Sequence, residues 1–176
     1  MKVIKCKTPE QSLAKELSSI NYTDCYKCTI NKLKEDISAD DILVKFWTEM
    51  PWWINKLLDL RNRLVKIVGL KGKEDGNIET LENAIRNGSD HPLMSISAKS
   101  ENETVLAMKD KHLTAYLSLY IDKKDDNSST NDIYTSTLVA FHKPLGYIYF
   151  YTIYPFHHLV VKKLLKHTLK KTVTEE

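Results

Sequence analysis

The second half of the chain alternates apolar and polar residues with the period of two that is typical of β-strands. The alternation predicts four strands, which are separated by short polar turns or by the polar run 122–132. Strands that follow one another so closely pair with their neighbours, so we expect an antiparallel meander. The four ranges are Leu93–Ser100, Thr104–Lys109, His112–Asp122 and Ile133–Phe141.

The first half is predicted to begin with a strand and to continue with two helices. Residues Asn21–Ile30 are rich in β-branched and aromatic side chains, which favours a strand. Ser38 stands three residues before an aspartate, the spacing of a capping box, and predicts a helix that runs to about Met50. Pro51 suits the first turn of a second helix, which we expect to end at about Val68.

The carboxyl-terminal part, Pro144–Lys171, fits two structures by pattern alone. Its tyrosine-rich beginning favours a strand by propensity, whereas Phe156–Lys171 has the periodicity of a helix. Pro155 and His157 interrupt the apolar run, which is shorter than the approximately 20 residues that a membrane span requires. A buried core helix is therefore the preferred interpretation.

Length and composition predict a single α+β domain. The chain has 176 residues, of which 42% are hydrophobic, so it can bury a core without a disulfide or a structural metal. Residues 71–90 hold three glycines among mixed charges and are expected to form a loop with at most a short helix at Glu79–Arg86.

The amino terminus and the cysteines indicate the cytoplasm. The first residues lack the apolar core of a signal peptide, and three cysteines are too few and uneven for a disulfide framework. Cys25 and Cys28 form a C-x-x-C pair inside a predicted strand, where residues three apart point to opposite faces. We therefore expect no metal. Because phosphate-binding and dinucleotide-binding glycine motifs are also absent, we expect no cofactor.

Charge is distributed unevenly along the chain. The formal net charge of +3 is too small to argue for nucleic acid. Residues 133–174 contain no Asp or Glu, although lysines are frequent there. This basic face is either solvated or a weak contact for an anionic membrane surface or an acidic partner. The lysines proposed for it are Lys162, Lys163, Lys166 and Lys170.

Polar side chains on two apolar helix faces are the first candidates for chemistry. Arg61 falls near the middle of the apolar arc of the second helix, and His157 lies on the apolar side of the last helix. Because a lone buried charge is costly, Arg61 either pairs with a carboxylate, extends to water or anchors an anionic ligand group. His157 is either a satisfied core histidine or the best acid–base candidate of the chain.

Three sequence blocks resemble a bacterial family known as domain of unknown function family 2867. They are Phe46–Lys71, Glu103–Leu113 and Pro144–Val161, in this order, so the resemblance covers about residues 20–170. Its members are similar to the helix-grip superfamily of START domains, polyketide cyclases and birch-pollen-type allergens. The resemblance implies a curved antiparallel sheet wrapped around a long carboxyl-terminal helix, with an apolar cavity between them.

The resemblance also implies a domain core at about 20–171, a variable insert at 71–90 and one long helix over Pro144–Lys171 with a kink at Pro155. The positions that match the family motifs are expected to lie near the cavity, and aromatic side chains are expected to line it. These residues are Arg61, Asn62, Asp110, His112 and His157, with Trp53 and Phe150 as aromatic lining.

Three functions remain open at this point. The preferred one is the binding of a small apolar or amphipathic molecule in the cavity, with Arg61 and His157 orienting its polar end. The second is an enzyme of cyclase, isomerase or hydratase type in which His157 moves a proton and Arg61 or a tyrosine polarises an oxygen. The third is an interaction module that uses the basic face of the last helix. The sequence leaves the oligomeric state open.

Overall fold

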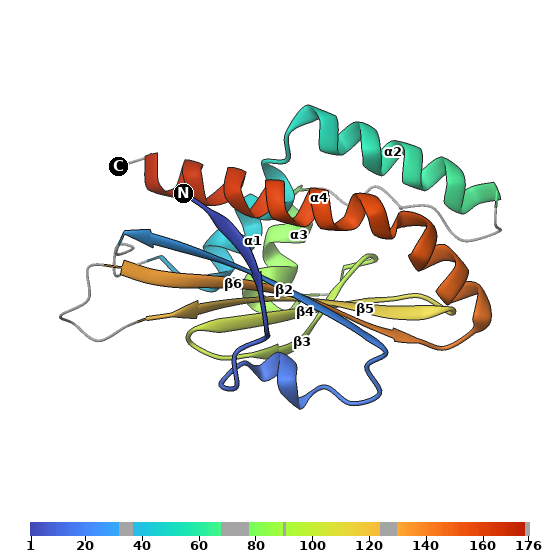
Figure 1. The fold of residues 1–176 in the computed structure, drawn as a ribbon, viewed down its shortest axis with the longest axis horizontal. Coiled ribbons are helices and arrows are strands. Elements are labelled where there is room, and N and C mark those ends of the chain that lie inside the picture. The colour runs from blue at the N-terminus through green and yellow to red at the C-terminus, as the bar shows by residue number, and fades with distance from the viewer. Residues whose placement is uncertain (32–36, 68–77, 90, 124–129, 175–176) are drawn as a thin grey trace.

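The computed structural model describes residues 1–31, 37–67, 78–89, 91–123 and 130–174, with the side chains of 58, 61–67 and 174 excepted (Figure 1). Within these ranges, six strands form one antiparallel sheet in the order β1-β2-β6-β5-β4-β3. The strands are β1 (Val3–Cys6), β2 (Tyr22–Asn31), β3 (Ser95–Lys99), β4 (Glu103–Lys109), β5 (Leu113–Asp122) and β6 (Thr130–Phe141).

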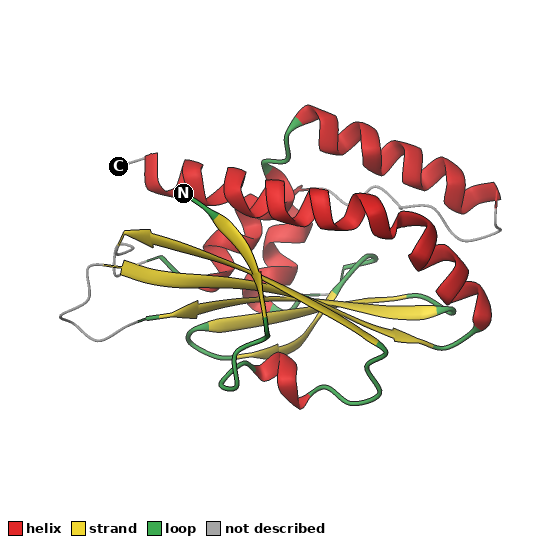
Figure 2. Ribbon diagram, viewed as in Figure 1, coloured by secondary structure: helices red, strands yellow, loops and turns green. Residues whose placement is uncertain are grey.

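The helices lie on one face of the sheet, as Figure 2 shows in red above the yellow strands. Of the helical segments in the described ranges, only the short 3-10 helix η1 lies below the sheet in this view. Helix α4 extends along the sheet and bends in its first half, where Pro155 interrupts the backbone hydrogen bonding (Figure 1). The helical segments are η1 (Leu13–Glu16), α1 (Ala39–Thr48), α2 (Trp52–Ile67), α3 (Ile78–Asn87) and α4 (Pro144–Thr174).

The predicted α+β class, the antiparallel meander and the long carboxyl-terminal helix are all confirmed. The arrangement of sheet and helix is consistent with a helix-grip fold. One correction concerns the strand predicted at Asn21–Ile30, which is the second strand because β1 precedes it. A strand of four residues is too short to show a reliable period of two. The short helix expected at Glu79–Arg86 is α3, and the preceding residues 68–77 lie outside the described part of the chain.

The main core forms between the helices and the sheet face that they cover. From α4, the side chains of Leu165 and Leu169 are fully buried, and from β2 those of Cys28 and Ile30 are at most 4% exposed. Full burial of a side chain as large as leucine contributes about 1.5–3 kcal/mol. The apolar face of α4 therefore holds this helix against the sheet.

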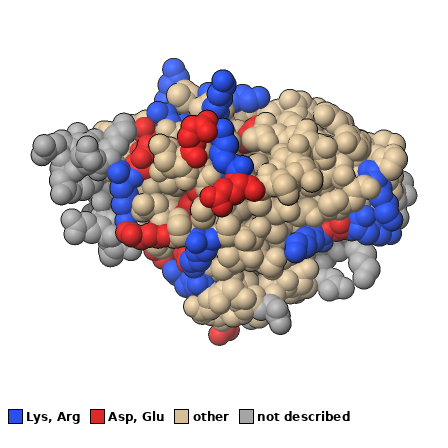
Figure 3. Space-filling model, turned by 90° about the horizontal axis from the view of Figure 1, so that it is seen from below, with Lys and Arg blue, Asp and Glu red and all other residues tan. Residues whose placement is uncertain are grey.

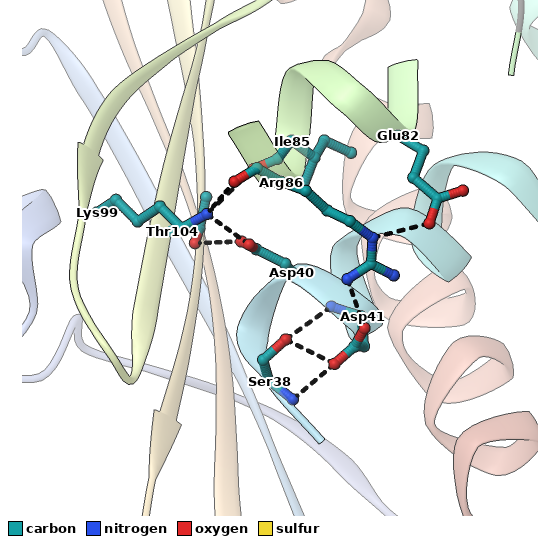
Figure 4. A network of polar contacts seen from close by, with 8 residues as sticks. All are labelled: Ser38, Asp40, Asp41, Glu82, Ile85, Arg86, Lys99 and Thr104. Carbon is teal, nitrogen blue, oxygen red and sulfur yellow. Dashed lines mark hydrogen bonds and ion pairs between the residues drawn. The ribbon is translucent and has the colours of Figure 1, made fainter. Parts of the chain in front are cut away.

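A capping box fixes the start of α1, as its spacing predicted. The Ser38 hydroxyl oxygen accepts a hydrogen bond from the Asp41 backbone N–H, and the Asp41 carboxylate accepts one from the Ser38 backbone N–H. The other carboxylate oxygen of Asp41 pairs with Arg86 of α3 at 2.7 Å (Figure 4). One side chain thus joins the start of α1 to α3.

The neighbouring carboxylate ties the same helix to the sheet. Asp40 accepts hydrogen bonds from Lys99 of β3 and from the Thr104 hydroxyl of β4 (Figure 4). The Lys99 ammonium also donates to the Arg86 backbone carbonyl at 2.8 Å. This network orients α1 and α3 over the edge of the sheet formed by β3 and β4. Its members form hydrogen bonds with one another.

Gly146 marks a close approach between α4 and the turn that joins β4 to β5. A Cβ at this position would overlap the His112 carbonyl oxygen. The same carbonyl oxygen accepts hydrogen bonds from the backbone N–H groups of His142 and Lys143. The first turn of α4 is therefore held against the β4–β5 turn by backbone contacts.

Replacing Gly146 with alanine is expected to lower the free energy of unfolding by about 1–3 kcal/mol, because backbone atoms must move to admit the methyl group. Urea unfolding of the purified protein measures the change. Thr152→Ala, at an exposed position of the same helix, serves as the control and is expected to stay within about 0.5 kcal/mol of the parent. A Gly146→Ala protein as stable as this control would contradict the close approach.

Candidate functional site

A buried carboxylate lies between the sheet and the middle of α4. Asp24 belongs to β2, and its side chain is 0% exposed. One oxygen, Oδ2, accepts hydrogen bonds from the Tyr22 hydroxyl at 2.7 Å and from His157 Nε2 at 3.1 Å. Side chains alternate along a strand, so Tyr22 and Asp24 share the face that α4 covers.

Two neighbouring aromatic side chains complete this group. His158 Nδ1 lies 2.6 Å from the Tyr26 hydroxyl and 3.3 Å from Asp24 Oδ2. Burial lowers the pKa of His158, although the charge of Asp24 opposes this effect. The neutral ring is thereby favoured, and its Nδ1 shares a hydrogen bond with the Tyr26 hydroxyl. We call these five residues, Tyr22, Asp24, Tyr26, His157 and His158, the Asp24 cluster.

The cluster keeps Asp24 ionised and its tyrosines protonated. Burial acts to raise the pKa of Asp24, but the hydrogen bonds from His157 and Tyr22 and the charge of His157 hold the pKa below its ordinary value. Burial, with the charge of Asp24, raises the pKa of Tyr26 to about 12, and burial with the hydrogen bond to Asp24 raises the pKa of Tyr22 further. Asp24 therefore carries a negative charge beneath α4.

Three buried oxygen atoms, one on Asp24 and two on neighbouring threonines of β6, lack a hydrogen-bond partner among the described residues. Among the described residues, Asp24 Oδ1 has no hydrogen-bond partner, and neither do the hydroxyl oxygens of Thr135 and Thr137 on β6. Thr137 is the cross-strand partner of Asp24, and Thr135 is that of Tyr26. Directly opposed side chains have Cβ atoms about 4.5–5.5 Å apart. The three unpartnered groups therefore lie on adjacent positions of one sheet face.

Other buried carboxylates of the described sheet are fully satisfied, which distinguishes Asp24. Glu103 accepts hydrogen bonds on both oxygens, from the hydroxyls of Ser12 and Ser118 and from the Leu13 backbone N–H. Asp132 accepts a hydrogen bond from the Thr29 hydroxyl on one oxygen and from the Lys27 ammonium on the other. Both carboxylates lie on the sheet face away from α4. Their hydrogen-bond partners all belong to the chain itself and hold neighbouring segments together.

Aromatic side chains form one wall of the Asp24 cluster. The ring of Phe150 lies 4.6 Å from that of Tyr22 and 6.1 Å from that of His157, measured between centroids. Phe150, Leu113 and Val139 are the buried members of the apolar group at this end of the sheet. Phe150 and His157, seven residues apart on α4, therefore both lie beside Tyr22.

The predicted residues Asp110 and His112 lie at the β4–β5 turn. The Asp110 carboxylate accepts a hydrogen bond from the His112 backbone N–H at 3.0 Å, and both ring nitrogens of His112 are buried without a partner. The next residue, Leu113, belongs to the apolar group of Phe150. The turn therefore adjoins the aromatic wall, and its observed hydrogen bonds position the backbone.

The remaining predicted positions lie apart from the cluster or outside the described residues. Trp53 is half-buried and packs against the main core between the helices and the sheet. The backbone of α2 includes Arg61 and Asn62, but the side chains of both residues lie outside the described part of the chain. Their proposed roles in ligand binding stay predictions.

Sequence reasoning found His157 but missed the carboxylate that it contacts. Asp24 shares a strand face with Tyr26, Cys28 and Ile30, so a period of two places a carboxylate among buried side chains. The same argument that selected Arg61 on an apolar helix face would have selected Asp24. Asp24 and His157 are 133 positions apart, so no local sequence pattern connects them.

The donor set of the cluster suits hydrogen bonding. In the described part of the chain, no group of three or more His, Cys, Asp or Glu side chains is arranged to hold a metal ion. Asp24 accepts hydrogen bonds from Tyr22 and His157, and Tyr26 shares a hydrogen bond with His158. The arrangement can therefore orient His157 and accept one further hydrogen-bond donor at Asp24 Oδ1.

The pKa of Asp24 predicts how stability depends on pH. Because its pKa is lower in the folded state than in the unfolded state, Asp24 stabilises the fold above about pH 4, and this contribution is lost as the pH falls through the folded pKa. We expect Asp24→Asn to lower the free energy of unfolding by about 1.5–3 kcal/mol at pH 7. Urea unfolding between neutral and acidic pH measures the difference.

The difference between the parent and Asp24→Asn should shrink as the pH falls below about 4. Glu10→Gln removes a highly exposed carboxylate and serves as the matched control with little effect. A difference that is the same at every pH would show that Asp24 carries no stabilising charge.

Comparisons with known proteins place this site within a family. A family profile described as "Protein of unknown function (DUF2867)" matches residues 17–164, which include the whole Asp24 cluster. Comparison with curated proteins and with solved structures finds no match. The predicted resemblance to this family is confirmed over most of the chain, whereas the wider helix-grip superfamily stays a prediction. The chain belongs to the DUF2867 protein family.

Proposed function

We propose that this protein binds a small amphipathic molecule between the sheet and the first half of α4. The polar end of the molecule would donate a hydrogen bond to Asp24 Oδ1 and contact the Thr137 hydroxyl. The observation that carries the proposal is the set of buried, unpartnered oxygens at Asp24, Thr135 and Thr137. More than about nine in ten buried polar groups in proteins have a partner.

The contrast with the satisfied carboxylates supports a ligand role for Asp24. Where a buried carboxylate serves only the fold, as Glu103 does, both oxygens accept hydrogen bonds from the chain. An unsatisfied buried polar group costs about 1–3 kcal/mol, and more when it is charged. A hydroxyl or a protonated amine on the ligand would remove this cost.

The apolar wall supports an amphipathic ligand. Phe150, Leu113 and Val139 lie at the same end of the sheet as the cluster, beside the half-buried ring of Tyr154. Small-molecule sites combine such apolar lining with a few polar groups that fix orientation. Because Asp24 holds a negative charge, an alcohol or an amine suits its free oxygen, and a carboxylate does not.

We expect 1-decanol and decylamine to bind at least tenfold more tightly than decanoate, because only the first two donate to Asp24. Isothermal titration calorimetry on the full chain compares the three molecules, which share one apolar tail. Thr137→Val keeps the shape and removes the hydroxyl, so it should weaken the binding of 1-decanol by about threefold to tenfold.

The matched control is Thr23→Val, which makes the same substitution at an exposed position on the opposite face of β2. Equal affinity of the parent and Thr137→Val for 1-decanol would contradict the polar contact. Absence of binding for all three molecules, together with no extra mass in native mass spectrometry of the protein from its host, would contradict ligand binding here.

A second function is favoured by the contact between Asp24 and His157. A carboxylate that accepts a hydrogen bond from the Nε2–H group orients the imidazole and leaves Nδ1 as the basic nitrogen. We propose proton transfer by His157, as in an isomerase or hydratase, as the alternative function.

Incubating the protein with a small-molecule extract, followed by untargeted mass spectrometry, tests the alternative. We expect a substrate to be consumed by the parent and not by His157→Gln. His167→Gln, a histidine substitution on the same helix that lies outside the cluster, is the control and should retain the activity. Consumption by all three proteins, or by none, would reject a catalytic His157.

A further inference from the structure

The outward face of α4 carries a cluster of exposed apolar side chains in its first half. Their exposed fractions range from 42% to 64%. When residues are placed about 100° apart around the helix, they fall within about half of its circumference. We call this group the α4 apolar face; its members are Tyr147, Ile148, Tyr151, Phe156 and Leu159.

Lysines continue this face into the second half of the helix. Lys162 and Lys163 are exposed and fall on the same arc as the apolar side chains, about one turn beyond Leu159. The predicted contact residue Lys166 is half-buried, and Lys170 is exposed near the end of the helix. Because residues 133–174 contain no Asp or Glu, no carboxylate of α4 offsets these charges.

Helix α2, which contacts α4, also exposes an aromatic side chain and a lysine. Trp52 is 70% exposed, and the Lys56 ammonium lies 4.8 Å from the centre of its ring. Helix α2 runs alongside α4, and the two helices are in contact (Figure 1). Tryptophan, tyrosine and lysine are the residues that concentrate at membrane–water interfaces.

We infer that the outward face of α4 binds the surface of an anionic lipid bilayer. The helix lies along the interface, with its apolar first half among the acyl chains and Lys162 and Lys163 against the lipid phosphates. The stretch from Ile148 to Leu159 is about 16 Å long at 1.5 Å per residue. No described helix has the length and apolarity to cross a bilayer, so the contact is peripheral.

Charge favours a bilayer over a second copy of the chain as the occupant. A second copy would bring the same lysines to the interface and no acidic residue from α4 to pair with them. Anionic lipids supply a negative group for each lysine. The attraction contributes about 1 kcal/mol of binding free energy for each lysine near the surface.

The sheet face away from α4 lacks this segregation of charge. Figure 3 views the molecule from below and shows basic and acidic side chains lying close together in several places on that side. Several are paired, as Lys27 is with the buried Asp132 at 3.2 Å and Lys15 with Glu10 at 2.7 Å. A surface of mixed sign gives little attraction to an anionic bilayer, whereas the second half of α4 carries lysines and no carboxylate.

Flotation of the full chain with lipid vesicles tests the inference. Vesicles of phosphatidylcholine with phosphatidylglycerol are compared with pure phosphatidylcholine, at about 0.1 M and about 1 M salt. We expect binding to the anionic vesicles that weakens at high salt. Lys162→Gln combined with Lys163→Gln should weaken it by about 30-fold, or about fivefold for each lysine.

A second variant tests the apolar half. Phe156→Ser combined with Leu159→Ser removes two exposed side chains and should weaken vesicle binding by more than tenfold, without loss of the folded circular dichroism spectrum. The matched control is Ile4→Ser combined with Ile78→Ser, which removes apolar side chains of similar exposure elsewhere and should bind like the parent.

Two results would overturn the inference. One is the absence of binding to anionic vesicles, or equal binding by the parent and both α4 variants. The other is a dimer in analytical ultracentrifugation that Phe156→Ser with Leu159→Ser dissociates, which would assign the face to a second copy. The affinity for 1-decanol is measured separately and depends on Thr137, so failure of either proposal leaves the other testable.

Discussion

The packing of α4 on the sheet is the interaction on which the rest of the structure depends. Val161, Leu164, Leu165 and Leu169 bury one face of the helix against β-strands that are distant in sequence. At its start, the close contact between Gly146 and the His112 carbonyl oxygen fixes where the helix leaves the sheet. Burial of apolar surface holds the helix, and backbone contact sets its position.

That packing places one helix between two different environments. Its inner side brings His157 and His158 to a carboxylate that is fully buried on β2. Its outer side carries exposed aromatic side chains followed by lysines. A molecule held at Asp24 would therefore lie directly beneath the helix that we propose to contact lipid, and both proposals depend on the same 31-residue element.

Much of the fold could be predicted because its signals are local. The capping box at Ser38, the period of two in the meander and the helical period of the carboxyl-terminal part each require only neighbouring residues. β1 was missed because four residues carry too little periodicity, and its pairing with β2 is a tertiary contact. The apolar arc expected for α2 holds at Ile54, which is buried, and fails at Leu60, which is 47% exposed.

The same distinction between local patterns and tertiary contacts applies to the candidate site. From the sequence alone, it was possible to determine that His157 lies on the apolar side of a helix and that Asp24 shares a strand face with buried side chains. Only the tertiary structure decided that these two residues meet and that Tyr22, Tyr26 and His158 join them. Periodicity defines the face on which a residue lies. The partner across that face depends on how distant elements pack.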